Sequence, residues 1–241
     1  MKVRHLHSWN LSPRDAASLQ RELASRVVQQ GEPRESETQF VAGCDVAFDK
    51  AHDRAFAAVV VLAYPSLDAV ERVVAVSPIA FPYVPGLLSF RETPALLDAF
   101  ERVQHAPDLV MVDGHGYAHP RRFGLACHVG LLLDVPTIGV AKSRLIGEAR
   151  QPAAARGSRT DLLDAGEVIG TLLRIRDAVR PVYVSTGHRI SLAAAARWVL
   201  RCARGYRLPE PTRLADRLAG DAKRGGLAAA DESGTMKSDG H

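Results

Sequence analysis

The sequence has few cysteines, and they lie far apart. The 3 cysteines are an odd number and form no CxxC pair; they are Cys44, Cys127 and Cys202. This argues against a disulfide framework and against a structural zinc site. We therefore expect a protein of a reducing cytoplasm.

Long apolar segments are also missing. The opening residues, MKVRHLHSWN, contain no apolar stretch of the kind that a secretory signal needs. A membrane span needs about 20 apolar residues, and the longest run, near Leu125 to Leu133, is interrupted by Cys127, His128 and Gly130. The sequence predicts a soluble, cytoplasmic protein without membrane contact.

The motifs of several enzyme classes are absent as well. The chain has no GxSxG elbow, no Walker A loop and no HExxH pair, and its histidines do not have zinc-finger spacing. What is present is an ordinary globular composition: 241 residues, of which 46% are hydrophobic and 24% charged. The formal net charge of +4 favours a polyanionic partner.

Hydrophobic periodicity divides the chain into two patterns. The first is a helix and three strands with short links, over residues 15–30, 40–48, 54–63 and 67–77. The second alternates helices with short buried strands, over residues 93–103, 108–112, 120–133, 135–140 and 191–204. An antiparallel meander followed by parallel strands predicts a ribonuclease H-like α/β fold, with a mixed central sheet flanked by helices. Residues 218–241 are polar and rich in small side chains, which predicts a disordered tail.

The densest motif runs from Asp113 to Arg122. A buried strand brings Asp113 to its carboxyl end, where open α/β sheets place their sites. Gly114 and Gly116 let the backbone approach a ligand closely, and a helix expected from Pro120 would favour an anion at its start. Donors suited to phosphate follow, namely His119, Arg121 and Arg122. The alternative is an acid that caps a turn beside two solvated arginines; the length of the run favours a site.

Two further acids belong to the candidate site. Asp45 lies within a predicted strand and shares its face with Gly43 and Ala47, which leave room for an ion. An exposed edge or a structural ion pair is an equal alternative for Asp45 alone. With Asp113 on a neighbouring strand, it would suit Mg²⁺. Glu92, just before an expected helix start, is the third candidate, although a first-turn acid is also common there.

Three other segments carry residues suited to nucleic acid. Pro82 to Gly86 forms a stiff turn whose Tyr83 would wedge between bases or, alternatively, pack under its own prolines. Lys142 follows a strand end, where an ammonium group would meet phosphate or, alternatively, water. Residues 185–189 form a third strand-end turn.

Together these motifs resemble the endonuclease V family. The matching runs, in chain order, are VAGCDV (41–46), PYVPG (82–86), SFRE (89–92), DGHG (113–116), HPRR (119–122), GVAKS (139–143), GHRIS (187–191) and LPEPTR (208–213). The resemblance covers about residues 10 to 217, so we expect one nuclease domain over 1–217 and a tail after it.

The resemblance implies a DNA repair endonuclease that contains Mg²⁺, for which Mn²⁺ substitutes. It would nick DNA at the second phosphodiester bond 3′ to deoxyinosine and other deaminated bases, leaving a 3′-hydroxyl and a 5′-phosphate. Two alternatives remain: the same site acting mainly on inosine in single-stranded RNA, or a protein that binds damage without cutting. We expect a monomer.

The resemblance also implies roles for individual residues. The metal ligands would be Asp45 and Asp113, and the catalytic set would add Glu92 and Lys142. Substrate would be bound by Tyr83, Pro85, Gly86, Gly114, His119 and Arg121. Asp216 stands where some members of the family carry a histidine, and the resemblance assigns it no role.

Overall fold

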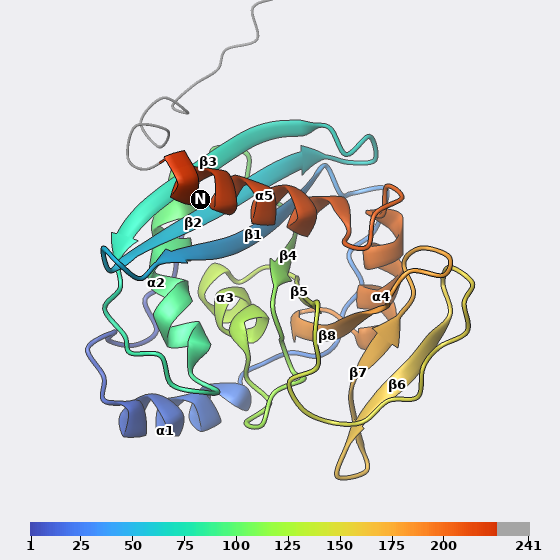
Figure 1. The fold of residues 1–241 in the computed structure, drawn as a ribbon, viewed down its shortest axis with the longest axis horizontal. Coiled ribbons are helices and arrows are strands. Elements are labelled where there is room, and N and C mark those ends of the chain that lie inside the picture. Colours follow the sequence, from blue (N-terminus) through green and yellow to red (C-terminus); the bar gives the residue numbers. More distant parts are fainter. Residues whose placement is uncertain (226–241) are drawn as a thin grey trace, which may run out of the picture.

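The computed structural model describes residues 1–225 and shows one mixed sheet between two layers of helices (Figure 1). The sheet has 8 strands in the order β3-β2-β1-β4-β5-β8-β7-β6. The strands are β1 (Phe40–Asp49), β2 (Arg54–Ala63), β3 (Ala69–Pro78), β4 (Leu109–Asp113), β5 (Thr137–Ala141), β6 (Arg159–Asp164), β7 (Glu167–Leu173) and β8 (Val182–His188). The helices are α1 (Pro13–Ala24), α2 (Leu88–Arg102), α3 (Leu125–Leu133), α4 (Leu192–Arg201) and α5 (Glu210–Gly225).

The strand pairing confirms the predicted fold class. β1, β2 and β3 form the antiparallel meander, and β4 pairs in parallel with both β1 and β5. Beyond β5, the strands β8, β7 and β6 continue the sheet in antiparallel pairs. The hairpin β6–β7 and the strand β8 were not predicted.

The alternating side chains of β1 separate two hydrophobic cores. Ala42 and Cys44 pack on one face with side chains of α2 and α3. Val41 packs on the opposite face with side chains of α4 and α5. Asp45 follows the alternation and lies on the α5 face. The strand therefore delivers this acid between the sheet and the last helix.

Two predicted helix starts are wrong. α2 begins at Leu88 and contains Pro94, because the buried Phe90 packs against Phe81 and Leu87 and extends the helix beyond the proline. α3 begins at Leu125. The segment before α3 is a turn, because the N–H of Gly124 donates to the carbonyl of Gly116.

The expected domain boundary at residue 217 also differs from the structure. α5 continues to Gly225 and buries Ala215, Ala219 and Ala222 at helical spacing. Ala222 packs against Phe56 of the sheet, so burial orders a segment whose composition alone indicated a tail. The rest of the expected tail, residues 226–241, lies outside the described residues. Within 1–225, no helix is long and apolar enough to cross a membrane.

Candidate active site

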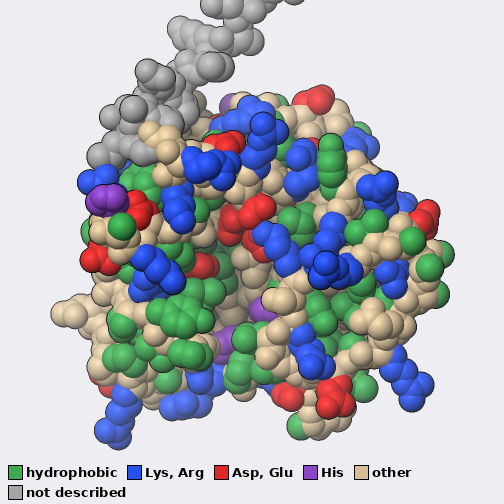
Figure 2. All heavy atoms as spheres, viewed as in Figure 1, with side chains coloured by type: hydrophobic (Ala, Val, Ile, Leu, Met, Phe, Trp, Pro, Cys, Tyr) green, Lys and Arg blue, Asp and Glu red, His purple; other side chains and the backbone are tan. Residues whose placement is uncertain are grey.

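The two predicted metal ligands meet on neighbouring parallel strands. Asp45 follows Cys44, which pairs with Val112, and Asp113 follows Val112 at the end of β4. A third carboxylate, from Asp216 of α5, joins them, and one oxygen of each acid lies within 4.8 Å of the others. We call Asp45, Asp113 and Asp216 the carboxylate cluster. Figure 2 shows acidic side chains at the margin of a hollow in this face, with Lys and Arg side chains beside them.

Gly43 explains how α5 reaches the cluster. A Cβ atom at Gly43 would lie 2.0 Å from the carbonyl oxygen of Pro211 in the first turn of α5, so only glycine permits this contact. The space beside Gly43, expected from the sequence to hold an ion, is therefore filled by helix backbone. The close contact instead brings Asp216 over the sheet, where it approaches Asp45 and Asp113.

Lys142 lies between two of the three acids. It follows β5, and its Nζ is 2.6 Å from Oδ2 of Asp113 and 2.9 Å from Oδ1 of Asp216. Burial favours the neutral amine, but the contacts with Asp113 and Asp216 outweigh burial and raise the Lys142 pKa to about 12. Lys142 is therefore a fixed cation within the site.

The acids of the site are short of positive charge. Burial, and then the charge of Asp113, raise the pKa of Asp45 to about 8. Burial also raises the pKa of Asp113, although Lys142 opposes the shift. A divalent cation would relieve this repulsion, and hard oxygen ligands suit Mg²⁺ or Mn²⁺. The residues present therefore fit such an ion.

Glu92 lies close to the carboxylate cluster but is not grouped with it. The side chain comes from the interior of α2 and is buried. Burial, and then the charges of Asp45 and Asp113, raise its pKa well above the ordinary value. The sequence placed Glu92 just before a helix start, whereas the structure places it inside α2. Glu92 is therefore not a first-turn acid.

The loop that carries Tyr83 is held by two residues that were expected to bind phosphate. The carbonyl of Gly86 accepts hydrogen bonds from Nε2 of His119 at 3.1 Å and from Nη2 of Arg121 at 2.6 Å. Nδ1 of His119 accepts from the backbone N–H of Arg121, so Nε2 carries the ring proton. Burial, and then Arg121, lower the pKa of His119 to about 4, which keeps the ring neutral at pH 7. Tyr83 itself is 72% exposed.

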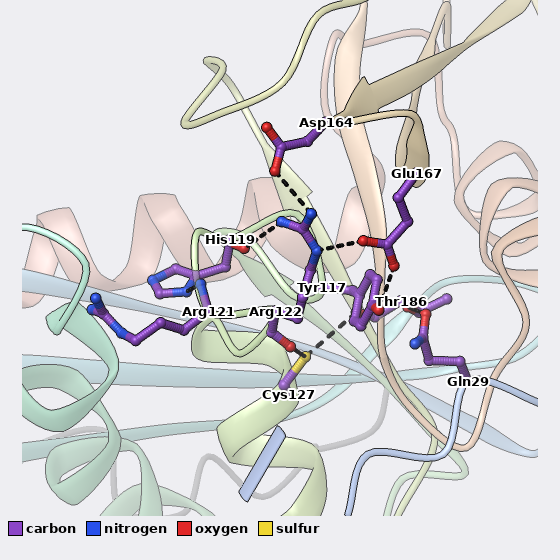
Figure 3. A network of polar contacts seen from close by, with 9 residues as sticks. All are labelled: Gln29, Tyr117, His119, Arg121, Arg122, Cys127, Asp164, Glu167 and Thr186. Atoms are coloured by element: carbon purple, nitrogen blue, oxygen red, sulfur yellow. Dashed lines mark hydrogen bonds and ion pairs between the residues drawn. The ribbon is translucent and has the colours of Figure 1, made fainter. Parts of the chain in front are cut away.

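Arg122 is paired with the hairpin β6–β7. Its guanidinium lies 2.8 Å from both Asp164 and Glu167, and Glu167 also accepts a hydrogen bond from the hydroxyl of Tyr117 (Figure 3). In this arrangement Arg122 is engaged by two carboxylates, and its contact with phosphate stays a prediction. Through these two ion pairs, Arg122 holds the loop after β4 against the turn between β6 and β7.

Gly116 of the DGHG run allows the loop to lie directly on β8. A Cβ atom at Gly116 would be 2.1 Å from the carbonyl oxygen of Thr186. The N–H of Gly116 donates to Oγ of Ser185 at 2.9 Å. Ser185 and Thr186 thus belong to β8 and support the loop, whereas the sequence indicated a separate strand-end turn.

Sequence reasoning missed Asp216 and Arg207 as parts of the site. Arg207 donates to the carbonyl of Lys142, and its charge lowers the pKa of Asp113 after the larger effects of burial and Lys142. The spacing of Ala215, Ala219 and Ala222 is the signal that would have revealed α5 and, with it, the position of Asp216.

Known proteins share both the sequence and the fold. An endonuclease V family profile matches residues 21–217. The endonuclease V of Gloeobacter violaceus is 55% identical over 213 residues, which are 87% of this chain and 86% of the relative. The chain belongs to the endonuclease V family. It is therefore a nuclease by descent, and the resemblance inferred from its motifs is confirmed.

Solved members of the family have the same architecture. The endonuclease V of Streptomyces avermitilis matches with a TM-score of 0.86 and 43% identity, covering 93% of this chain and 99% of that one. The Ciona intestinalis endonuclease V matches with a TM-score of 0.77 and 28% identity, covering 88% and 98%. That protein was crystallised with a 24mer DNA containing an inosine followed by a ribo-adenosine.

Proposed function

We propose that this endonuclease V nicks DNA at the second phosphodiester bond 3′ to deoxyinosine and other deaminated bases, by metal-assisted hydrolysis. The observation that carries the proposal is the carboxylate cluster, because three converging acids, two of them paired with one ammonium group, form a site for a hard cation. The inosine-containing DNA bound by the Ciona relative supports the choice of substrate.

We propose Asp45, Asp113 and Asp216 as the residues that would hold Mg²⁺ or Mn²⁺. When bound, such an ion lowers the pKa of a water molecule and neutralises charge on the phosphate. Lys142 keeps its proton at Nζ and offsets the negative charge that develops on the leaving oxygen. Glu92 adds a buried carboxyl group close to Asp45 and Asp113, which would act on the site through a bound water.

The recognition of the lesion is assigned to the loop that carries Tyr83. Pro85 and Gly86 shape the loop, and His119 and Arg121 fix it through the Gly86 carbonyl. A fixed, exposed tyrosine fills the gap that is left when a weakly paired base leaves the duplex. Gly114 has a φ of 156°, a conformation that favours glycine. The absence of a side chain there would let the backbone next to Asp113 approach the DNA strand closely.

A cleavage assay tests the proposal. A 5′-labelled duplex with one deoxyinosine is incubated with Mg²⁺, with Mn²⁺ and with EDTA, beside an undamaged duplex and a single-stranded RNA with one inosine. We expect one product that ends in a 3′-hydroxyl after the nucleotide following the lesion, only with a metal. Equal nicking of undamaged DNA, or exclusive cleavage of RNA, would overturn the DNA repair assignment. Binding without nicking would identify a damage-binding protein.

A further inference from the structure

Tyr206 is an exposed aromatic residue that has no place in the proposed mechanism. Among residues 1–225, the exposed large hydrophobic side chains include two aromatic ones, Tyr83 at 72% and Tyr206 at 52%. Tyr83 belongs to the loop before α2, whereas Tyr206 lies in the connection between α4 and α5. An exposed aromatic ring is available to stack on a base of a nucleic acid.

The connection that carries Tyr206 is fixed by arginine side chains. Arg204 donates to the carbonyl of Ser66 at 2.8 Å, and Arg176 donates to the carbonyl of Gly205 at 2.9 Å. Arg207 donates to the carbonyl of Lys142 at 2.5 Å. These contacts tie the connection to the meander, to the segment after β7 and to the end of β5. The backbone that carries the Tyr206 ring is therefore ordered before any ligand binds. Less conformational entropy of this segment is then lost on binding.

Arg213 lies over the Tyr206 ring. Its guanidinium carbon is 4.3 Å from the ring centroid, and its Nε donates to Glu210 at 2.8 Å. The guanidinium group fixes the orientation of the ring and places positive charge beside it. A flat aromatic surface next to a cation is the combination that proteins use to stack bases of single-stranded nucleic acid.

Two contacts place Tyr206 beside the carboxylate cluster. Arg213, which covers the ring, and Asp216 are three residues apart on α5 and so lie on the same side of the helix. The next residue, Arg207, reaches the carbonyl of Lys142. Figure 1 shows the loop before α2 and the α4–α5 connection as separate segments, with β4 between them in this view. The contacts through Arg213 and Arg207 place Tyr206 beside the cluster, on a different segment from Tyr83.

We propose that Tyr206, supported by Arg213, is a stacking platform for an unpaired base of the strand that is cut. The proposal rests on the proposed nuclease function, since it requires a strand that passes the carboxylate cluster. Tyr83 would act at the lesion, and Tyr206 would hold a second part of the strand beside the cluster. Stacking does not depend on the identity of the base, so this contact would add affinity without sequence preference.

Base-by-base fluorescence tests the platform. Single-stranded oligonucleotides with one inosine carry 2-aminopurine at successive positions, and binding is measured in EDTA for the wild type, Tyr206→Leu, Tyr206→Phe and Val70→Ala. Val70 is 43% exposed on the edge strand β3 and serves as the control for loss of a surface apolar group. We expect quenching at one position in the wild type and Tyr206→Phe, and its loss in Tyr206→Leu, with about tenfold weaker binding.

The outcomes separate the platform from the proposed function. Equal affinity and equal quenching for Tyr206→Leu and the wild type would overturn the platform, even if the wild type nicks inosine-containing DNA. Quenching that Tyr206→Leu loses, in a wild type that binds but does not nick, would show base stacking by Tyr206 and overturn the proposed function alone. Melting temperatures of all variants show whether a lost signal reflects unfolding, and Tyr206→Trp provides a second aromatic replacement that must restore quenching.

Discussion

Nζ of Lys142 lies 2.6 Å from Oδ2 of Asp113, so the lysine expected to meet phosphate is paired with an expected metal ligand. The expected phosphate contact of Lys142 and the expected metal contact of Asp113 therefore belong to one site, in which the positive charge of Lys142 offsets the negative charge of Asp113. With no ion bound, the ammonium group supplies part of the positive charge that the acids need. A bound cation and Lys142 therefore act on the same carboxylate.

Replacing Lys142 should affect catalysis and metal binding in opposite directions. In Lys142→Met, we expect cleavage to fall by about 100-fold or more, because a donor aimed at developing charge is lost. The midpoint of Mg²⁺ binding, followed by thermal shift, should move to lower concentration, since no ammonium group competes for Asp113. Normal turnover in this variant would show that the lysine serves only the metal-free protein.

Asp216 can be tested by comparison with Asp113. Asp113→Ala should abolish nicking while DNA binding persists, because removing a carboxylate also removes repulsion from phosphate. Asp216→Ala should lose most activity, whereas Asp216→His should retain a substantial part, because an imidazole nitrogen can also bind a divalent cation. Rates at saturating Mg²⁺ and Mn²⁺ measure both effects. Unchanged nicking by Asp216→Ala would remove this residue from the proposed ligands.

The stability of the metal-free protein should depend on pH through Asp45. Burial and the charge of Asp113 raise its pKa from the ordinary 3.8 to about 8 in the folded protein. Because the folded state holds this proton more tightly, its stabilising effect is complete below about pH 4 and is lost as the pH rises to about 8. We expect Tm in EDTA to fall between pH 5.5 and 8.5. Asp45→Asn should reduce the fall, and Mg²⁺ should restore Tm at the higher pH.

The role of Tyr83 predicts a difference between duplex and single-stranded substrates. Opening a stack costs a few kcal/mol, so Tyr83→Ala should slow nicking of an inosine-containing duplex more than nicking of the single strand. The ratio of the two values of kcat/KM is the measurement, with Tm as the control for folding. Equal losses on both substrates together with a lowered Tm would mean that Tyr83 only packs its loop.

The elements that could be predicted from the sequence are those with a clear local pattern. β2 has the predicted bounds because a long apolar run is enclosed by turn residues. β6 escaped prediction because Leu162 is its one buried residue, so an edge strand of this kind has almost no hydrophobic signal. α5 was not predicted because the buried side chains after its first turn are alanines, which give a weak hydrophobic signal among charged residues.

In the candidate site, too, the residues placed by a local pattern could be predicted, and those placed by tertiary contacts could not. Asp45 and Asp113 follow from strand alternation and strand ends, which are local properties. The pairing of Arg122 with Glu167 joins segments 45 residues apart, and the contact of His119 with Gly86 joins segments 33 apart. Neither pairing leaves a periodic signal in the sequence. Such contacts depend on tertiary structure, so a motif shows which residues are present but not which partners they choose.

The contact of Gly43 with Pro211 makes the cluster a late product of folding and synthesis. Asp45 and Asp113 are made early and lie on strands that pair directly, whereas Asp216 arrives only when α5 docks on β1. A ribosome-bound chain that has not yet released α5 therefore carries an incomplete centre. The proposed metal site is therefore completed only when the last described helix is in place.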